Sequence, residues 1–182
     1  MSGKTYIDVP LGPANVEFGD TSPIDFSITK GGVVFTASST KHDITVDQYG
    51  DTVVKSVFKG RTCQVRVPFA LHDLPKLAKV TPNSTLYTDT TDPVNPKYRL
   101  NVGSKAGLNL TAAAEKLVIK PTDPEATPND WITVPLASPM SDPEYTYNSD
   151  NERIAIVTFV GFPDLSNDGN LYIMGDETVT GV

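Results

Sequence analysis

The side chains best suited to acid–base or nucleophilic chemistry are two histidines, and neither stands in a recognisable catalytic arrangement. His42 lies in a polar stretch, and His72 directly precedes Asp73, where a helix is predicted to begin. A hydrolase triad would need an activated serine beside one of them, and the chain has no G-x-S-x-G sequence. The sequence therefore predicts a protein that is not an enzyme.

Metal-binding sequences are equally incomplete. The stretch from Asp164 to Gly169 resembles the start of a calcium loop, but Gly175 stands where the loop's glutamate would be. A hairpin turn built on Asp168 and Gly169 is the favoured interpretation. The chain also lacks H-E-x-x-H, a Cys/His cluster and a phosphate-binding glycine loop. We expect no metal and no cofactor.

The single cysteine, Cys63, excludes an intrachain disulfide and suits a reducing compartment. It stands on an alternating stretch, which predicts a small buried apolar side chain. The N-terminal residues lack the apolar segment of a secretion signal. No apolar run approaches the ~20 residues that a membrane helix needs. We expect a protein made in the cytoplasm, with no membrane association.

Charge is unevenly distributed along the chain. The net charge is −7, which disfavours a general affinity for nucleic acid. Residues 1–120 carry 14 Lys/Arg against 11 Asp/Glu (net +3), whereas residues 121–182 carry one Arg against 11 acids (net −10). Three interpretations stay open: a solvated acidic surface, electrostatic complementarity between copies, or an acidic wall that repels a polyanion.

The elements that would position any site centre on residues 31–81. Three extended runs are predicted there, Val33–Ala37, Ile44–Asp47 and Thr52–Phe58. Residues 48–51 (QYGD) predict a hairpin turn between the last two, and residues 59–61 (KGR) predict a second turn. In Thr62–Val67 apolar and polar residues alternate, which indicates a half-buried strand.

A short helix follows these strands. Asp73 is its predicted N-cap, and Pro75 falls in the first turn, where its missing N–H costs nothing. The predicted apolar stripe consists of Leu74, Leu77, Ala78 and Val80.

The rest of the chain completes an all-β domain. Residues 1–14 contain two prolines and predict a flexible N-terminal arm, and residues 15–182 predict one domain. Residues 82–96 predict a long loop with one short strand near Leu86 and Tyr87, and Arg153–Phe162 predicts a central strand. With about ten short strands separated by regular turns, we expect a β-sandwich or barrel with one flanking α-helix.

Several of these segments resemble the major tail tube proteins of long-tailed bacteriophages. They are the VDQYG turn, the alternating strand ending in VPF, the following DLPKLAKVTP, and ERIAIVTFVGFPD near the C-terminus. The resemblance implies a structural virion protein with the fold that tail tubes share with the type VI secretion tube. Its copies would form hexameric rings, stacked head to tail into a hollow conduit for DNA ejection. Implied partners are other copies and the terminator, tape measure and distal tail proteins, while DNA passes without specific binding.

The resemblance also implies a functional segment, the hairpin whose strands would line the ring. Its residues are Ile44, Thr45, Val46, Asp47, Thr52, Val53, Val54, Lys55, Ser56, Val57 and Phe58. In this interpretation Thr45, Asp47 and Thr52 face the lumen, whereas Ile44, Val46 and Val53 are buried. The cations Lys55, Lys59, Arg61 and Arg66 either form inter-subunit salt bridges or face outward.

Two alternatives stay open. The chain could be another tail or head–tail connector component of the virion. It could instead be a β-sandwich carbohydrate-binding module, which needs exposed aromatic residues on one sheet face. Tyr145 and Tyr147 are the only obvious pair of that kind.

Overall fold

A computed structural model describes residues 12–70, 72–140, 145 and 153–180. Within these residues it contains ten β-strands, one α-helix and two short 3-10 helices, which confirms the predicted all-β fold with a single short helix. No helix in this part of the chain has the length and apolar character needed to span a bilayer. Most of the predicted N-terminal arm lies outside the described residues, and its last residue, Ala14, is already paired in a strand.

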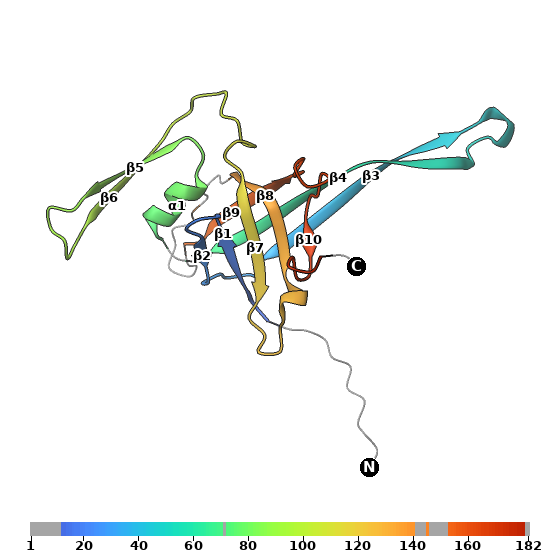
Figure 1. The fold of residues 1–182 in the computed structure, drawn as a ribbon. Helices are drawn as coiled ribbons and strands as arrows, with labels where there is room; N and C mark the ends of the chain where they lie inside the picture. The colour runs from blue at the N-terminus through green and yellow to red at the C-terminus, as the bar shows by residue number, and fades with distance from the viewer. Residues whose placement is uncertain (1–11, 71, 141–144, 146–152, 181–182) are drawn as a thin grey trace, which may run out of the picture.

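Eight strands form one antiparallel sheet in the order β2-β1-β7-β8-β9-β4-β3, with β10 paired to β8. Their bounds are β1 Ala14–Phe18, β2 Ile24–Phe26, β3 Val34–Thr45, β4 Val53–Phe69, β7 Glu115–Pro121, β8 Ile132–Met140, β9 Ala155–Phe162 and β10 Ile173–Met174. After β2 the chain returns to β4, where Thr29 bridges Phe69 and the Ala70 N–H donates to the Ile28 carbonyl at 3.0 Å. The sheet therefore curls back on itself into a barrel-like body (Figure 1).

The interior of this body is filled by phenylalanines from strands that are not sheet neighbours. The rings of Phe18 on β1 and Phe159 on β9 lie 4.8 Å apart, and those of Phe26 on β2 and Phe69 on β4 lie 5.1 Å apart. These contacts cross the barrel. Burial of side chains this large is the main source of its stability.

The predicted alternation within Thr62–Val67 is confirmed. Cys63, Val65 and Val67 are buried, whereas their neighbours Gln64 and Arg66 are exposed. The predicted central strand is also present, because β9 lies between β8 and β4 in the sheet.

The only α-helix in the described part of the chain is α1 (Leu74–Val80). The Asp73 carboxylate caps it by accepting the Lys76 N–H at 3.2 Å, and Leu77 and Val80 are buried against the body. Lys76 Nζ donates to the Asp25 carbonyl at 2.8 Å and ties the helix to β2. The helix thus lies on the body beside β2 (Figure 1).

The predicted turn at residues 59–61 is wrong, because β4 runs through it without a break. Thr40 lies opposite Gly60 and Lys41 opposite Phe58, so Lys59 is the extra residue of a β-bulge. A second register shift leaves Val54 unpaired, between the pairs Ile44–Lys55 and Thr45–Val53. Glycine between charged residues signals a bulge as readily as a turn.

Strand β3 is likewise continuous, although its polar stretch at residues 38–43 predicts a break. Its hairpin with β4 therefore extends far beyond the barrel (Figure 1). We call the projecting part, residues 38–62, the β3–β4 arm.

The long loop predicted at residues 82–96 is wrong in extent, although the short strand predicted near Leu86 and Tyr87 is present. Strand β5 (Ser84–Asp89) pairs with β6 (Lys97–Val102) along its whole length to form a separate two-stranded sheet. Ser84 Oγ lies 3.0 Å from the Ala78 carbonyl and 2.8 Å from the Thr81 carbonyl, which anchors this hairpin to α1. We call it the β5–β6 arm; it extends from the body on the side away from the β3–β4 arm (Figure 1).

Candidate assembly surface

The β3–β4 arm carries all eleven residues of the predicted ring hairpin, and it exposes apolar side chains to solvent. The exposed ones are Val46, Tyr49, Val53, Val54, Val57 and Phe58. A two-stranded hairpin is at best marginally stable alone in water, and clustered exposed apolar residues mark interaction sites. The arm therefore has the composition of a surface that another molecule covers.

The predicted division of the hairpin into a lumen face and a buried face is wrong for the single chain. Val46 is 37% exposed and Val53 is 48% exposed. Thr45 and Val53 were assigned to opposite faces, yet they are directly opposed partners and so share one face. The bulge at Val54 is the physical reason, because a one-residue shift moves side chains to the other face of a strand.

The pairing register defines the two faces of the arm. One face carries the opposed pairs Ser39–Arg61, Lys41–Phe58 and Asp43–Ser56. The other carries Thr40–Gly60, His42–Val57 and Ile44–Lys55. We call them the Arg61 face and the Val57 face.

Polar contacts fix the outer part of the Arg61 face. The Ser56 hydroxyl donates to the Asp43 carboxylate, and Lys41 Nζ lies 3.0 Å from the same carboxylate. These two contacts, the Ser56 hydrogen bond first, lower the pKa of Asp43. Asp43 therefore stays ionised to lower pH than an isolated aspartate and remains paired with Lys41 at neutral pH.

Nearer the body, Arg61 is held between two aromatic rings. Its guanidinium carbon lies 5.6 Å from the ring centre of Phe58 and 5.9 Å from that of Tyr172. Arg61 Nε donates to Ser39 Oγ at 2.9 Å, and Nη1 lies 3.4 Å from the Tyr172 hydroxyl. Tyr172 in turn packs edge-on against Phe35 at 5.1 Å. The guanidinium is thus fixed in place before any partner arrives.

A cavity of about 440 Å³ opens beside this guanidinium. Its lining consists of Phe58, Arg61, Gly169, Asn170, Leu171 and Tyr172. The sequence singled out Arg61 as a possible inter-subunit cation and Phe58 as a residue of the ring hairpin. It did not predict the cavity, because Arg61 and Tyr172 are separated by 111 positions and no local pattern connects them.

The β5–β6 arm has two unlike faces. Opposed Leu86 and Leu100 are both partly buried. The opposite face pairs Tyr87 with Arg99, whose guanidinium lies 4.6 Å from the tyrosine ring centre. Val94 at the tip is 82% exposed. This arm is a second candidate contact surface.

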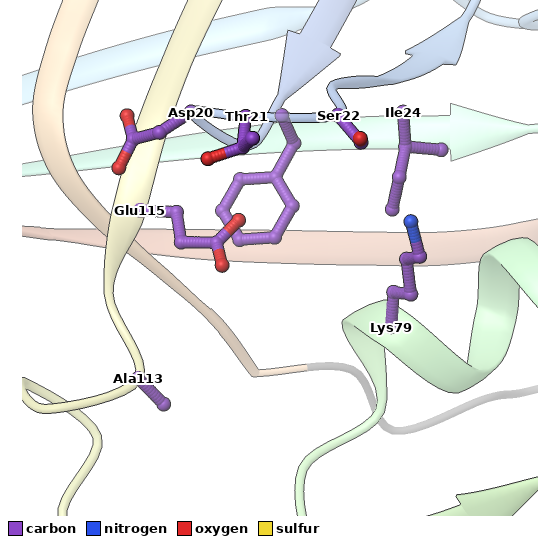
Figure 2. Close-up of a pocket in the computed structure, with 8 residues that line it drawn as sticks. Asp20, Thr21, Ser22, Ile24, Lys79, Ala113 and Glu115 are labelled. Atoms are coloured by element: carbon purple, nitrogen blue, oxygen red, sulfur yellow. The ribbon is translucent and has the colours of Figure 1, made fainter.

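A second cavity, of about 460 Å³, lies between α1 and the β1–β2 turn. Figure 2 shows Asp20 and Glu115 on one side of it and Lys79, from α1, on the other. Thr21 and Ser22 supply hydroxyls, and none of the described residues that line the cavity is a histidine or a cysteine. Its two carboxylates, one lysine and two hydroxyls make it a polar cavity.

The two histidines lie in different settings. His42 is exposed on the Val57 face, and His72 lies edge-on to Tyr145 with ring centres 5.9 Å apart. Within the described residues no group of three His, Cys, Asp or Glu side chains could hold a metal.

The predicted turn at residues 164–169 is confirmed. Asp164 Oδ1 accepts hydrogen bonds from the Ser166 N–H at 3.0 Å and from its hydroxyl at 2.6 Å. Asp168 and Gly169 adopt positive φ angles of 53° and 72°, as a tight turn requires.

Comparisons with known proteins give a structural likeness but no family. No protein family model matches the chain, and neither does any curated protein. A similar solved structure is a cryo-electron microscopy structure of the anti-feeding prophage (AFP) baseplate, 6-fold symmetrised. The two chains are 11% identical with a TM-score of 0.39, over 86% of this chain and 91% of the other. At that TM-score the function has to be argued from the chain itself.

Proposed function

We propose that this protein is a structural subunit of a phage tail tube, which assembles as hexameric rings stacked into a hollow conduit for DNA. The observation that carries the proposal is the β3–β4 arm, which projects from a stable body and exposes apolar side chains on a two-stranded ribbon. Neighbouring copies would supply the cover that the single chain lacks.

The edges of the arm support strand pairing between copies. Strand β4 pairs with β9 only from Gln64 to Phe69, so residues 53–63 leave one edge open. The outer edge of β3 has no partner strand in the described structure. Open edges are templates for further strands, and closing a ring of ribbons removes them. Six arms joined edge to edge would make a continuous inner barrel.

The charge of the arm refines the expected tube wall. Residues 38–62 carry four cations, Lys41, Lys55, Lys59 and Arg61, against Asp43, Asp47 and Asp51. The arm is therefore not an acidic wall. DNA would pass without sticking if neighbouring copies of the ring cover the remaining cations, as Asp43 already pairs with Lys41 within the single chain.

The remaining parts of the proposal follow from a structural role. We propose that the protein is not an enzyme, needs no cofactor, is made in the host cytoplasm and ends in the virion. Its other partners would be the terminator, tape measure and distal tail proteins. The carbohydrate-binding alternative gains no support, because Tyr145 is partly buried against His72 and Tyr147 lies outside the described residues.

Negative-stain electron microscopy with light scattering tests the proposal. Purified protein should form rings or hollow tubes of uniform diameter as its concentration rises. Val57→Asp should abolish them without lowering the melting temperature, because Val57 is 42% exposed in the single chain. A protein that stays monomeric at every concentration, or stops at a closed dimer, would overturn the tube assignment.

A further inference from the structure

We propose that the cavity beside Arg61 binds the Glu125 carboxylate of a second copy of this chain. The inference rests on the proposed function, because it specifies one contact through which the subunits assemble. The inference specifies one ion pair between two named residues, whereas the proposed function requires only that the copies assemble.

The first step is that Arg61 is ordered but incompletely satisfied. A guanidinium has five N–H donors, and within the described residues Arg61 uses them only toward Ser39 and Tyr172. No ion pair joins it to a carboxylate in that part of the chain. The rings of Phe58 and Tyr172 hold its plane, so little side-chain freedom is lost when a partner binds.

The second step is that the cavity has the composition of an interface anchor. Arginine and aromatic residues dominate the binding energy of protein interfaces, and here they line a single hollow of about 440 Å³. Phe58 is 60% exposed at its rim. A planar carboxylate matches the fork of an arginine better than any other side chain does.

The third step identifies the carboxylate. The acidic C-terminal third of the chain, residues 121–182, has a net charge of −10 and complements the net positive residues 1–120 of another copy. Most of its described carboxylates already accept a hydrogen bond or pair with a lysine in their own chain: Asp123, Asp130, Asp164, Asp176 and Glu177.

Two described carboxylates of that acidic third have no such partner, Asp168 and Glu125. Asp168 directly precedes Gly169, which lines the cavity of its own chain. Glu125 is exposed between β7 and β8, and only its backbone N–H is engaged, by Asp123 Oδ1 at 3.0 Å. Among the described carboxylates of residues 121–182, Glu125 is therefore the free one that lies away from this cavity in its own chain and that a neighbouring copy can offer.

The proposed contact joins two different surfaces, the base of the β3–β4 arm and the β7–β8 connection. Such a heterologous contact leaves both surfaces free at the ends of a pair and so propagates into a ring or filament. This is the geometry that ring assembly requires.

Charge reversal tests the contact. Arg61→Glu and Glu125→Arg should each raise the protein concentration needed for assembly by about tenfold or more, as expected when one partner of an interfacial charge pair is reversed. An equimolar mixture of the two variants should assemble near the wild-type concentration. When the two variants alternate in a ring, one kind of contact joins the native Arg61 to the native Glu125. The other kind joins the two substituted residues, which again have opposite charges. Lys105→Glu, an exposed charge reversal elsewhere, is the matched control and should change nothing.

The outcomes separate this inference from the proposed function. If wild-type protein assembles and either single variant assembles equally well, the Arg61–Glu125 contact is wrong while the tube proposal stands. Failure of the mixture to assemble would also overturn the pairing. If wild-type protein never assembles, both proposals fall. Melting curves of both variants should match wild type, which distinguishes lost contact from lost folding.

Discussion

The same two strands, β3 and β4, behave differently in the body and in the arm. Where β4 crosses the barrel, Cys63, Val65, Val67 and Phe69 are buried. Between residues 62 and 67 these buried side chains alternate with exposed ones, the last of which is Arg66. From residue 53 to residue 59 every β4 side chain is exposed. The backbone pairing continues through both parts. The alternation of apolar and polar residues therefore indicates that one face of a strand is covered. It does not decide whether the strand forms.

Packing differs as sharply as burial. In the body, a β-carbon added at Gly161 would collide with Cys63 Sγ and lie 3.0 Å from Val134 Cγ1. In the arm, stabilising contacts are surface pairs such as Lys41 with Asp43. Such pairs hold register but add little stability. We therefore expect the body to fold alone and the arm to depend on partners for its full order.

The largest expected contrast is in thiol reactivity. Cys63 is buried in the body, and this burial raises the pKa of its thiol, so the reactive thiolate is scarce at neutral pH. A cysteine placed in the arm by Val57→Cys, in a Cys63→Ala background, should react on the order of a thousandfold faster or more. Labelling followed by mass spectrometry under monomeric conditions measures both rates.

Denaturant supplies the control for that comparison. Cys63 should become as reactive as the arm cysteine once the body unfolds. Equal rates in native buffer would mean that the body opens as readily as the arm, and the proposed division would fail.

A smaller effect is expected from filling the space at Gly161. Gly161→Ala should lower the free energy of unfolding by about 1–3 kcal/mol, because the added methyl overpacks the contact with Cys63. Adding Cys63→Ala should recover part of that loss by removing the colliding sulfur. Urea unfolding of the two single variants and the double variant gives the coupling energy. Additive effects would show that the two sites are not in contact.

Sequence patterns predicted the body well because one face of each of its strands is buried within the single chain, which leaves a regular pattern of apolar residues in the sequence. Thr62–Val67, the strand at Arg153–Phe162 and the capped helix after Asp73 all follow from alternation, apolar continuity or cap chemistry. Each of these signals arises from burial in the single chain, which the sequence encodes locally.

The full length of the arms was not predicted, for the complementary physical reason. The polar residues 38–43 and the serine- and threonine-rich residues of β5 form strands that nothing in their own chain fully covers, so no clear apolar period marks them. The bulge at Val54 then reversed the predicted faces of the hairpin. The Arg61–Tyr172 contact joins distant parts of the chain, and only the three-dimensional structure shows it.

The smallest expected effect comes from the same substitution made in the two regions. Val57→Ser in the arm should change the free energy of unfolding by no more than about 0.5 kcal/mol, because Val57 is already 42% exposed. Val157→Ser in the body should cost about 2–4 kcal/mol, because Val157 is fully buried and the hydroxyl would lose its solvation. Urea unfolding of monomeric protein compares the free energies of unfolding of the two variants.

Val57→Ser should nevertheless weaken assembly, since the Val57 side chain would be covered only by a neighbouring copy. If Val57→Ser lowers the free energy of unfolding as much as Val157→Ser does, the arm belongs to the folded core. If the Val57→Ser protein assembles normally, the Val57 face is not part of the interface.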